Sequence, residues 1–456
     1  MLTVIAEVDF DSHCPIACQS RLARRFCLAN SVGAQGAQRM PTAGENAETP
    51  ADRAQAIRTF YESHPYPAPV TTLEQRLDRY RDPRRRRAQN LLLWPLEKPR
   101  PDRSILVAGC GTSQAARHAL MEPDARVTAI DVSETSLRHT HDLQRKHDIR
   151  NLQLHRLAIE RVGELGETFD QIVCTGVLHH LSDPDAGLRA LHDVLAVNGA
   201  MHIMVYAPYG RAGIYMMQDY CRLLGIGVRD EDLRDLGETV QALPIDHPIA
   251  GVVKRAKDFA RPNALADALL NPQDRAYSVP QVYDWLERCG LRFGRWYEQA
   301  AYLPQCGAID GAPHGARLAA LAPPAQHAAV ELLRGTMDRH SFAAYRDDRE
   351  REPQPITFES EAWRSFVPVR LPWTLTIKDR APAGVAAVLI NPSHTYPDLA
   401  LFIDAAQERL LAAIDGERSV AKILYGAGGA IGDERGGQFF TRLWEHDLIV
   451  FDAKRP

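Results

Sequence analysis

Short runs of hydrophobic residues alternate with helix-like segments through the middle of the chain. The apolar runs cover residues 105–109, 126–131, 152–157, 169–176 and 200–206. The clearest helix-like segments between them cover residues 114–120, 135–147 and 186–195. Short, continuous apolar runs are typical of strands that are buried on both faces, so this pattern predicts a parallel sheet covered by helices on both sides. Right-handed crossovers then make it a doubly wound α/β domain.

The N-terminal segment has a different texture. Residues 31–44 are small and polar, so we expect disorder there, and residues 51–61 are compatible with a helix. One hypothesis is that Met40 is the true first residue and that the preceding segment is a misassigned extension. The cysteines and the histidine between residues 13 and 27 match no common zinc pattern, and we expect a chance grouping.

The pattern changes again after residue 209. Further helices are expected over residues 214–224, 248–270 and 279–289, and a strand over 291–297. Proline, alanine and histidine over residues 312–327 indicate a loop or linker, and a charged stretch follows over 346–352. The last hundred residues contain strand candidates, an amphipathic segment and a helix-like segment: residues 366–370, 374–378, 399–414, 439–446 and 448–452. Helices that end in a strand are similar to a winged-helix-like module.

Composition and charge narrow the class of protein. The chain has 456 residues, and 54 basic against 58 acidic residues leave a net charge of −4, which argues against a general nucleic-acid binder. Hydrophobic residues make up 45% and charged residues 25%, as in a soluble globular protein. We see no bilayer-spanning stretch and no signal peptide, and the 8 cysteines are scattered. A reducing cytoplasm is therefore the expected location.

A glycine loop follows the first apolar run of the α/β region. Residues 105–114 read Ile-Leu-Val-Ala-Gly-Cys-Gly-Thr-Ser-Gln, a strand that leads through Gly-x-Gly into a helix. Glycines at such a turn let a ligand lie close to the main chain. Asp131 ends the next strand about twenty residues later, where an acid accepts hydrogen bonds from ribose hydroxyls. Loop and acid together predict a cofactor of the adenosine type; the alternative for Asp131 is a helix cap.

Three motifs in this order resemble those of the class I S-adenosylmethionine-dependent methyltransferases. They are Val-Ala-Gly-Cys-Gly-Thr (107–112), Val-Thr-Ala-Ile-Asp-Val-Ser (127–133) and Phe-Asp-Gln-Ile-Val-Cys-Thr-Gly-Val-Leu-His-His-Leu (169–181). Upstream, Tyr-Glu-Ser-His-Pro-Tyr-Pro (61–67) resembles the Asn-Pro-Tyr-Pro element of one bacterial subfamily. The resemblance covers residues 59–206 and, more loosely, the region to 307. It implies a mostly parallel seven-stranded sheet with a helical lid insertion, and S-adenosylmethionine as cofactor.

The resemblance also implies positions for the cofactor. The backbone at Gly109, Cys110 and Gly111 would wrap its methionine and ribose portion. Asp131 would hold the ribose, and Val132 would flank the adenine. For Cys110 itself we expect only a small apolar side chain within the loop, not a nucleophile.

Two departures from the family pattern concern acids. Many members have an acid at the end of the first strand, where this chain has Ala108. Many have another that contacts the adenine amine, where this chain has Ala158 with Ile159 beside it. The adenine would then be held by stacking and backbone amides, with Glu160 as a further candidate. The remaining candidates for cofactor binding are Gln114, Thr175 and Tyr61.

The reaction implied is direct displacement of the methyl group from a sulfonium. The cofactor carries its own leaving group, so the protein mainly positions the reactants, and a base is needed only for an acceptor that keeps its proton. His179 and His180 follow the fourth strand, and one of them, preferentially His179, would line the acceptor pocket or act as the base. The alternative is a histidine pair that caps the strand end. Tyr66 and Tyr61 would fold over the cofactor as a lid, or form an aromatic plug against the core.

The favoured function is methyl transfer to a small-molecule acceptor. The alternatives are a methyltransferase for a peptide, protein or RNA that the C-terminal module recruits, and a cofactor-binding scaffold or sensor without chemistry. The arginines at 84–87 are interpreted as a solvated helix face, so no nucleic-acid partner is expected. No membrane and no metal is expected either, and a homodimer is left open. The expected organisation is an extension (1–50), the methyltransferase core (51–210), a helical lid with a late strand (211–310), a linker (311–352) and a smaller C-terminal α+β domain (353–456).

Overall fold

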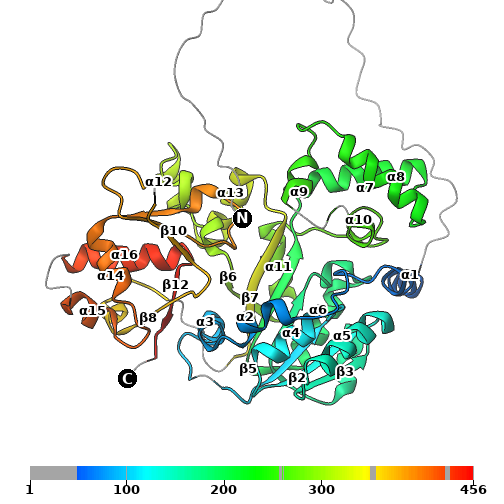
Figure 1. The fold of residues 1–456 in the computed structure, drawn as a ribbon, viewed down its shortest axis with the longest axis horizontal. Helices are drawn as coiled ribbons and strands as arrows, with labels where there is room; N and C mark the ends of the chain where they lie inside the picture. The colour runs from blue at the N-terminus through cyan, green and yellow to red at the C-terminus, as the bar shows by residue number, and fades with distance from the viewer. Residues whose placement is uncertain are drawn as a thin grey trace, which may run out of the picture. The chain divides into compact units, whose positions relative to one another are not determined.

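The computed structural model of the protein describes residues 49–454 except 99, 256–258, 260, 350–355, 380 and 427–431. Figure 1 shows the helices and strands of this part of the chain. The expectations about Met40, the segment 31–44 and the cysteines between 13 and 27 lie outside the described residues. Within them, no helix combines the length and the apolar character that crossing a bilayer requires.

Seven strands form one sheet in the order β3-β2-β1-β4-β5-β7-β6. The bounds are β1 (Ser104–Ala108), β2 (Arg126–Asp131), β3 (Leu152–Arg156), β4 (Phe169–Thr175), β5 (Leu195–Tyr206), β6 (Leu291–Trp296) and β7 (Arg339–Arg346). Strands β1 to β5 pair in parallel, and β7 runs antiparallel to both β5 and β6. The doubly wound, mostly parallel seven-stranded sheet expected from the sequence is confirmed.

Strand β1 shows why a continuous apolar run becomes a central strand. All five of its residues are buried. Ile105 and Val107 pack into the cluster that contains the buried side chains of α4 (Gln114–Met121) and α5 (Glu134–Lys146). Leu106 and Ala108 point the other way, into the cluster of α6 (Pro184–Asp193). Side chains that alternate between two helical layers must all be apolar.

The segment expected to be a loop or linker belongs to the α/β domain instead. The expected linker, residues 311–352, contains α12 (Gly315–Ala319), α13 (Pro323–Arg334) and β7, which takes the place between β5 and β6. Pro323 starts α13 at the first helical position, where its missing N–H costs nothing. Pro323 therefore starts a helix and is not a linker residue, and the sheet is complete at residue 346.

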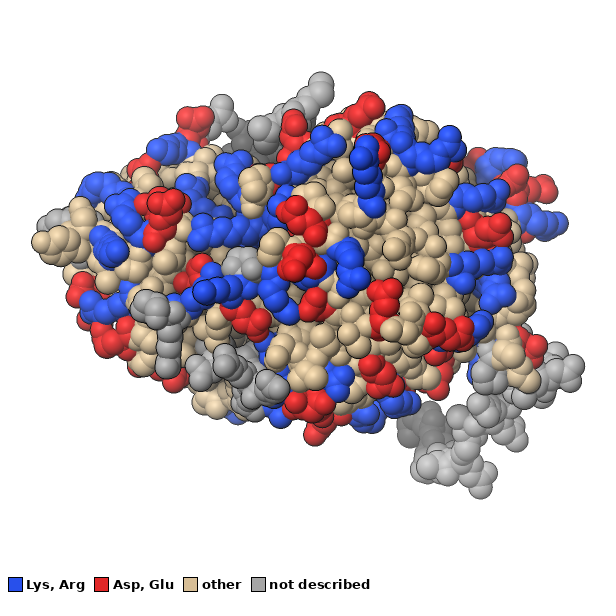
Figure 2. Space-filling model, turned by 90° about the horizontal axis from the view of Figure 1, so that it is seen from below, with Lys and Arg blue, Asp and Glu red and all other residues tan. Residues whose placement is uncertain are grey.

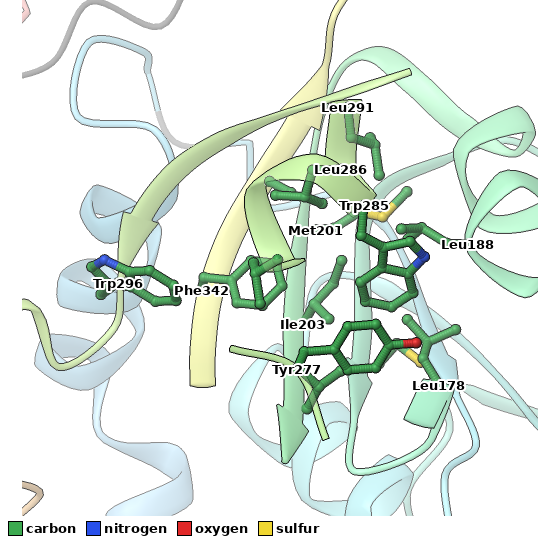
Figure 3. Packing of buried hydrophobic residues seen from close by; sticks show 14 of the residues in the cluster. Leu178, Leu188, Met201, Ile203, Tyr277, Trp285, Leu286, Leu291, Trp296 and Phe342 are labelled. Carbon is green, nitrogen blue, oxygen red and sulfur yellow. The ribbon is translucent and has the colours of Figure 1, made fainter. Parts of the chain in front are cut away.

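Large aromatic side chains fill the layer next to β5, β6 and β7. Trp285 and Tyr277 stack with ring centroids 4.6 Å apart, and Trp285 comes from α11 (Val279–Arg288). Trp296 and Phe342 lie on the neighbouring strands β6 and β7 (Figure 3). All four side chains belong to the largest buried cluster of the described residues. These side chains pack β6 and β7 against β5.

Four helices between β5 and α11 form an insertion with a core of its own. They are α7 (Ala212–Leu224), α8 (Asp230–Ala242), α9 (Ala250–Arg255) and α10 (Pro262–Leu269). Ile214, Leu236 and Leu265 are among the buried residues of this core. The sequence predicted one helix over residues 248–270, but the structure has two, because Pro262 opens a new helix.

The C-terminal part is a smaller α+β unit. Its elements are β8 (Val367–Arg370), β9 (Leu375–Ile377), β10 (Ala387–Ile390), β11 (Leu401–Ile403), β12 (Ile449–Asp452), α14 (Ala405–Ala412), α15 (Val420–Gly426) and α16 (Asp433–Glu445). β9, β10 and β11 form one antiparallel sheet, and β8 pairs with β12. The segment expected to be one amphipathic stretch over 399–414 is divided by Asp404, which caps α14 after β11 has ended.

A buried ion pair joins the C-terminal unit to the sheet. Asp447 Oδ1 accepts a hydrogen bond from Arg295 of β6 at 3.0 Å, and its Oδ2 accepts from the backbone N–H of Ala300 at 3.0 Å. The Asp447 side chain is only 2% exposed. Farther along, Val450 of β12 packs with Leu91 of α3 (Pro83–Leu93). The described part of the C-terminal unit therefore shares buried surface with the α/β domain.

Candidate active site

The glycine loop lies where the carboxyl ends of β1 and β4 meet. Gly109 and Gly111 have φ angles of +69° and +54°, a region that side-chain-bearing residues rarely adopt. A Cβ on Gly109 would come within 2.4 Å of Val177, and one on Gly111 within 2.8 Å of the carbonyl oxygen of Tyr66. The loop is also held from β2, since the N–H groups of Gly109 and Cys110 donate to the Ile130 carbonyl. Glycine is thus required at both positions for conformation and for space.

Asp131 ends β2 directly beside this loop. Its Oδ2 accepts a hydrogen bond from the Gly111 N–H at 2.8 Å, and its Oδ1 accepts one from the Ser133 N–H at 2.9 Å. Burial raises the pKa of the Asp131 carboxyl, and these two backbone N–H groups act in the opposite direction. Each carboxylate oxygen can accept a second bond, so Asp131 keeps capacity for a ligand. The helix that follows is capped by Ser133 and not by Asp131.

The N-terminal segment packs over the glycine loop. Thr112 donates a hydrogen bond from its hydroxyl to the Pro67 carbonyl at 2.8 Å. Glu62, at the end of α1 (Pro50–Ser63), accepts from the backbone N–H groups of Glu134 and Thr135 at 2.7 and 3.0 Å. A carboxylate at this helix N-terminus satisfies donors that the helix leaves free. The segment 61–67 is thereby attached to both β1 and β2 at their ligand-facing ends.

Tyr61 connects this segment to the helical insertion. Its hydroxyl donates to Asp267 Oδ1 of α10 at 2.9 Å and accepts from Asn271 at 3.0 Å. Burial, followed by the charge of Asp267, raises the pKa of Tyr61 well above its usual value, so the hydroxyl remains a donor. A residue near the start of the described chain thus closes one side of the site against a helix two hundred positions away.

These elements enclose a cavity of about 470 Å³, within the usual size range of small-molecule sites. Of the fourteen residues predicted from the sequence, twelve line it: Tyr61, Tyr66, Gly109, Cys110, Gly111, Gln114, Asp131, Val132, Ala158, Ile159, Thr175 and His180. Glu160, the further candidate near the adenine position, also lines it. Gln114 and Thr175 meet each other there, with the amide donating to the hydroxyl at 2.6 Å. The other two, Ala108 and His179, do not line the cavity.

The preference for His179 over His180 as the pocket residue is wrong. Both belong to the short turn at Leu178–His180 that follows β4, and their ring centroids lie 4.2 Å apart. His180 lines the cavity, and its Nδ1 lies 2.6 Å from the Gln273 carbonyl oxygen. His179 is fully buried behind it, with its ring 4.0 Å from that of Tyr206, and burial lowers its pKa well below the usual value. Ala108 is likewise buried in the β1 core.

The helical insertion contributes lining residues that the sequence analysis did not identify. Ile214, Val252 and Phe259 form an apolar wall, while Arg211 and Asp267 bring charges to it. Arg211 donates to Asp274 Oδ2 at 3.0 Å, and its guanidinium lies 3.4 Å from the centroid of the Tyr206 ring. No local motif marks these residues, because they reach the site only through the packing of the insertion.

Two more observations concern residues singled out from the sequence. Cys110 is buried, and burial raises the pKa of its thiol well above the usual value, as fits a small packing residue. In the arginine run, Arg84 pairs with Asp82, Arg86 with Glu122 and Asp124, and Arg87 with Asp452. The face shown in Figure 2 has acidic side chains among its basic ones.

Comparison with known proteins agrees with this architecture. Residues 106–201 match a family model described as a methyltransferase domain. The chain is 39% identical over 197 residues to an uncharacterized protein of Synechococcus sp., a match over 41% of this chain and 47% of that protein. The chain therefore matches about half the length of that curated relative.

Two solved structures have a similar fold. The structure of PKMT2 from Rickettsia typhi superposes with a TM-score of 0.57 and 16% identity, over 82% of this chain and 75% of that chain. The structure of the same protein in complex with AdoHcy gives a TM-score of 0.57 and 14% identity, over 84% of this chain and 77% of that chain. At this level of identity the likeness concerns the fold, and it extends well beyond residues 106–201.

Proposed function

We propose that the protein transfers the methyl group of S-adenosylmethionine to a small-molecule acceptor. The match of residues 106–201 to a methyltransferase domain supports this proposal. The observation that carries this proposal is the position of the cavity. It lies against Gly109, Gly111 and Asp131 on one side and against the helical insertion on the other. The same cavity thus offers an acceptor for ribose hydroxyls, backbone that a ligand can approach closely, and a separate wall for a second reactant.

The residues present fit the cofactor. Positive φ angles at Gly109 and Gly111 leave the backbone open to close approach, and Asp131 retains free acceptor capacity for ribose hydroxyls. Val132 and Ile159 would then flank the adenine with apolar surface. When bound, S-adenosylmethionine supplies an activated methyl group and its own leaving group.

The remaining cavity residues would act on the acceptor. Ile214, Val252 and Phe259 exclude water from the reaction, and Tyr66 closes the cavity from the N-terminal segment. With Nδ1–H of His180 donating to the Gln273 carbonyl, Nε2 keeps the lone pair that a base needs. His180 therefore takes the role that the sequence analysis gave preferentially to His179.

A macromolecular acceptor is the second candidate, and one feature of the C-terminal unit favours it. Leu375 and Ile377 of β9 and Phe402 of β11 are 50%, 41% and 52% exposed. Ile377 and Phe402 both pair with Val388 of the central strand β10, so they share one face of this sheet. An apolar sheet face of this kind suits a peptide or protein that is brought to the cavity.

The test is transfer of label from methyl-labelled S-adenosylmethionine in a cell extract, followed by size fractionation. Labelled product below a few kilodaltons supports the small-molecule proposal, and label in the protein or RNA fraction supports the second candidate. The matched variant is Asp131→Ala. At a cofactor concentration near the wild-type Kd it should add less label, above the background of the extract alone, to the fraction that the wild-type protein labels. Binding of S-adenosylhomocysteine without transfer to any fraction would leave only the scaffold function and overturn methyl transfer.

A further inference from the structure

Three side chains with metal-ligating atoms converge beside the cavity. They are His179 and His180 from the turn after β4, and Asp274 from the segment that follows α10. One ring nitrogen of each histidine and one carboxylate oxygen of the aspartate lie within 4.8 Å of one another. His180 belongs to the cavity lining, so this cluster, which we call the His–His–Asp cluster, borders the acceptor side of the site.

Polar atoms of this cluster are buried without partners. His179 has 0% exposure, and neither of its ring nitrogens has a hydrogen-bond partner. The Asp274 side chain is 2% exposed, and its Oδ1 is also buried without a partner. Leaving such atoms unsatisfied costs about 1–3 kcal/mol each, so a native structure normally provides a partner. Atoms on two different segments that lack partners at the same place indicate a shared ligand.

The other polar atoms of the cluster are held in the way that metal ligands are held. His180 Nδ1 donates to the Gln273 carbonyl at 2.6 Å, which fixes the ring tautomer. Asp274 Oδ2 accepts from Arg211 and from Gln218, each at 3.0 Å, which orients the carboxylate and leaves Oδ1 for another partner. Ligating histidines and carboxylates are typically oriented by such outer hydrogen bonds.

We propose that His179, His180 and Asp274 bind a divalent cation of the zinc class, with an open coordination position toward the cavity. Two imidazole nitrogens and one carboxylate oxygen form a three-ligand set of the kind that catalytic zinc sites use, in which the fourth position takes water or substrate.

Arg211 acts against cation binding, because its guanidinium lies next to Asp274. Part of its charge is compensated by Asp274 itself and by the Tyr206 ring beneath it. A single buried water is the competing occupant, since it too would satisfy His179 and Asp274 Oδ1. The two occupants differ in what they predict for added metal.

The role of the cation rests on the proposed methyl transfer, whereas its binding does not. An acceptor hydroxyl or thiol at the open position would lose its proton to solvent more readily, because the cation lowers the pKa of a bound group. A lone pair of the acceptor atom then forms the bond to the methyl carbon while the carbon–sulfur bond breaks. The sulfonium becomes a neutral thioether, and the oxidation state of the metal does not change. His180 would serve as a ligand in this case and not as a base.

The experiment is a titration of the full-length protein, stripped with a chelator, with Zn²⁺ alone in a calorimeter. We expect one equivalent of Zn²⁺ to bind. His179→Gln and Asp274→Asn should each weaken binding by about 100-fold or more, because loss of a residue that only orients a ligand already costs up to about 100-fold. The matched control is His192→Gln. His192 lies near Asp347 and Asp348 in a comparable but more exposed group, and its replacement should leave the affinity unchanged.

Two further readouts keep the outcomes distinct. Addition of Co²⁺ to the wild-type protein should give the visible absorption of a tetrahedral site. This measurement uses only the wild-type protein, so it does not depend on whether a variant folds. Binding of S-adenosylhomocysteine is measured in parallel, so failure of the cofactor proposal is seen separately from failure of the metal proposal. Absence of Zn²⁺ binding, or binding lost only in His192→Gln, would overturn the inference and leave a water as the occupant.

Discussion

Replacement of Asp131 with alanine tests the cofactor assignment most directly. In the structure each carboxylate oxygen accepts one backbone N–H, from Gly111 at 2.8 Å and from Ser133 at 2.9 Å. The second lone pair of each oxygen is the proposed acceptor for a ribose hydroxyl. A hydrogen bond to a charged group contributes about 1.5–3 kcal/mol, so loss of this pairing should weaken binding roughly tenfold to a hundredfold.

The assay is calorimetric titration with S-adenosylhomocysteine and with its 2′,3′-dideoxy analogue. Asp131→Ala should weaken binding of the natural ligand but hardly change binding of the analogue, which has no ribose hydroxyls to lose. Asp131→Asn is the matched variant, since its amide oxygen can still accept from the Gly111 N–H and support the loop. This comparison separates loss of the ribose contact from collapse of the glycine loop.

Two results would refute the reasoning. Equal affinity of Asp131→Ala and wild type, with an intact fold, would mean that the carboxylate does not contact the ribose. An equal loss for both ligands would mean that Asp131 acts only on the loop, as a structural partner of Gly111 and Ser133.

Three other predictions concern the loop, the core and the junction between units. Gly111→Ala should weaken S-adenosylhomocysteine binding in the same titration, because φ is +54° and the new Cβ would lie 2.8 Å from the Tyr66 carbonyl oxygen; unchanged affinity would contradict this. His327 accepts a hydrogen bond from Trp296, and burial lowers its pKa to about 4. Between pH 6.5 and 4 the unfolded chain therefore binds a proton that the folded chain does not. The free energy of unfolding should therefore decrease as the pH is lowered, by about 2 kcal/mol at pH 5 relative to neutral pH. Urea unfolding of His327→Gln should lack this part of the loss. Asp447→Ala should destabilise the protein by about 3–5 kcal/mol, because it removes the buried carboxylate that pairs with Arg295 and accepts from the Ala300 N–H, and thermal unfolding should show Asp447→Asn to be milder.

Much of the α/β domain could be predicted from the sequence because its signals are local. Strand β1 is apolar at every position since helices cover both of its faces. The glycine loop and Asp131 could be found for a related reason. A sharp turn with positive φ requires glycine, and a strand end places its last side chain at the ligand-facing edge of the sheet.

Other features were decided by tertiary structure. Strand β7 has an arginine at each end and follows a segment rich in proline and alanine, so that no local pattern marks it as the partner of β5 and β6. His179 and His180 are adjacent in the sequence, and only the packing of Tyr206 and Gln273 determines which ring enters the cavity. Periodicity describes one element at a time, whereas pairing and side-chain direction at an irregular turn depend on neighbours distant in the chain.

The acceptor side of the site shows the same division. Arg211, Asp267 and Asp274 have no motif around them, and Asp267 meets Tyr61 across 206 positions of sequence. The positions of these polar residues depend on how the apolar core of the helical insertion packs. This packing produces no recognisable sequence pattern around the polar residues themselves. The sequence by itself determined the parallel strands β1 to β5 and the glycine loop with Asp131 at their carboxyl ends. Tertiary packing decided the acceptor half of the cavity, because those side chains are brought together only when distant segments bury their apolar faces against one another.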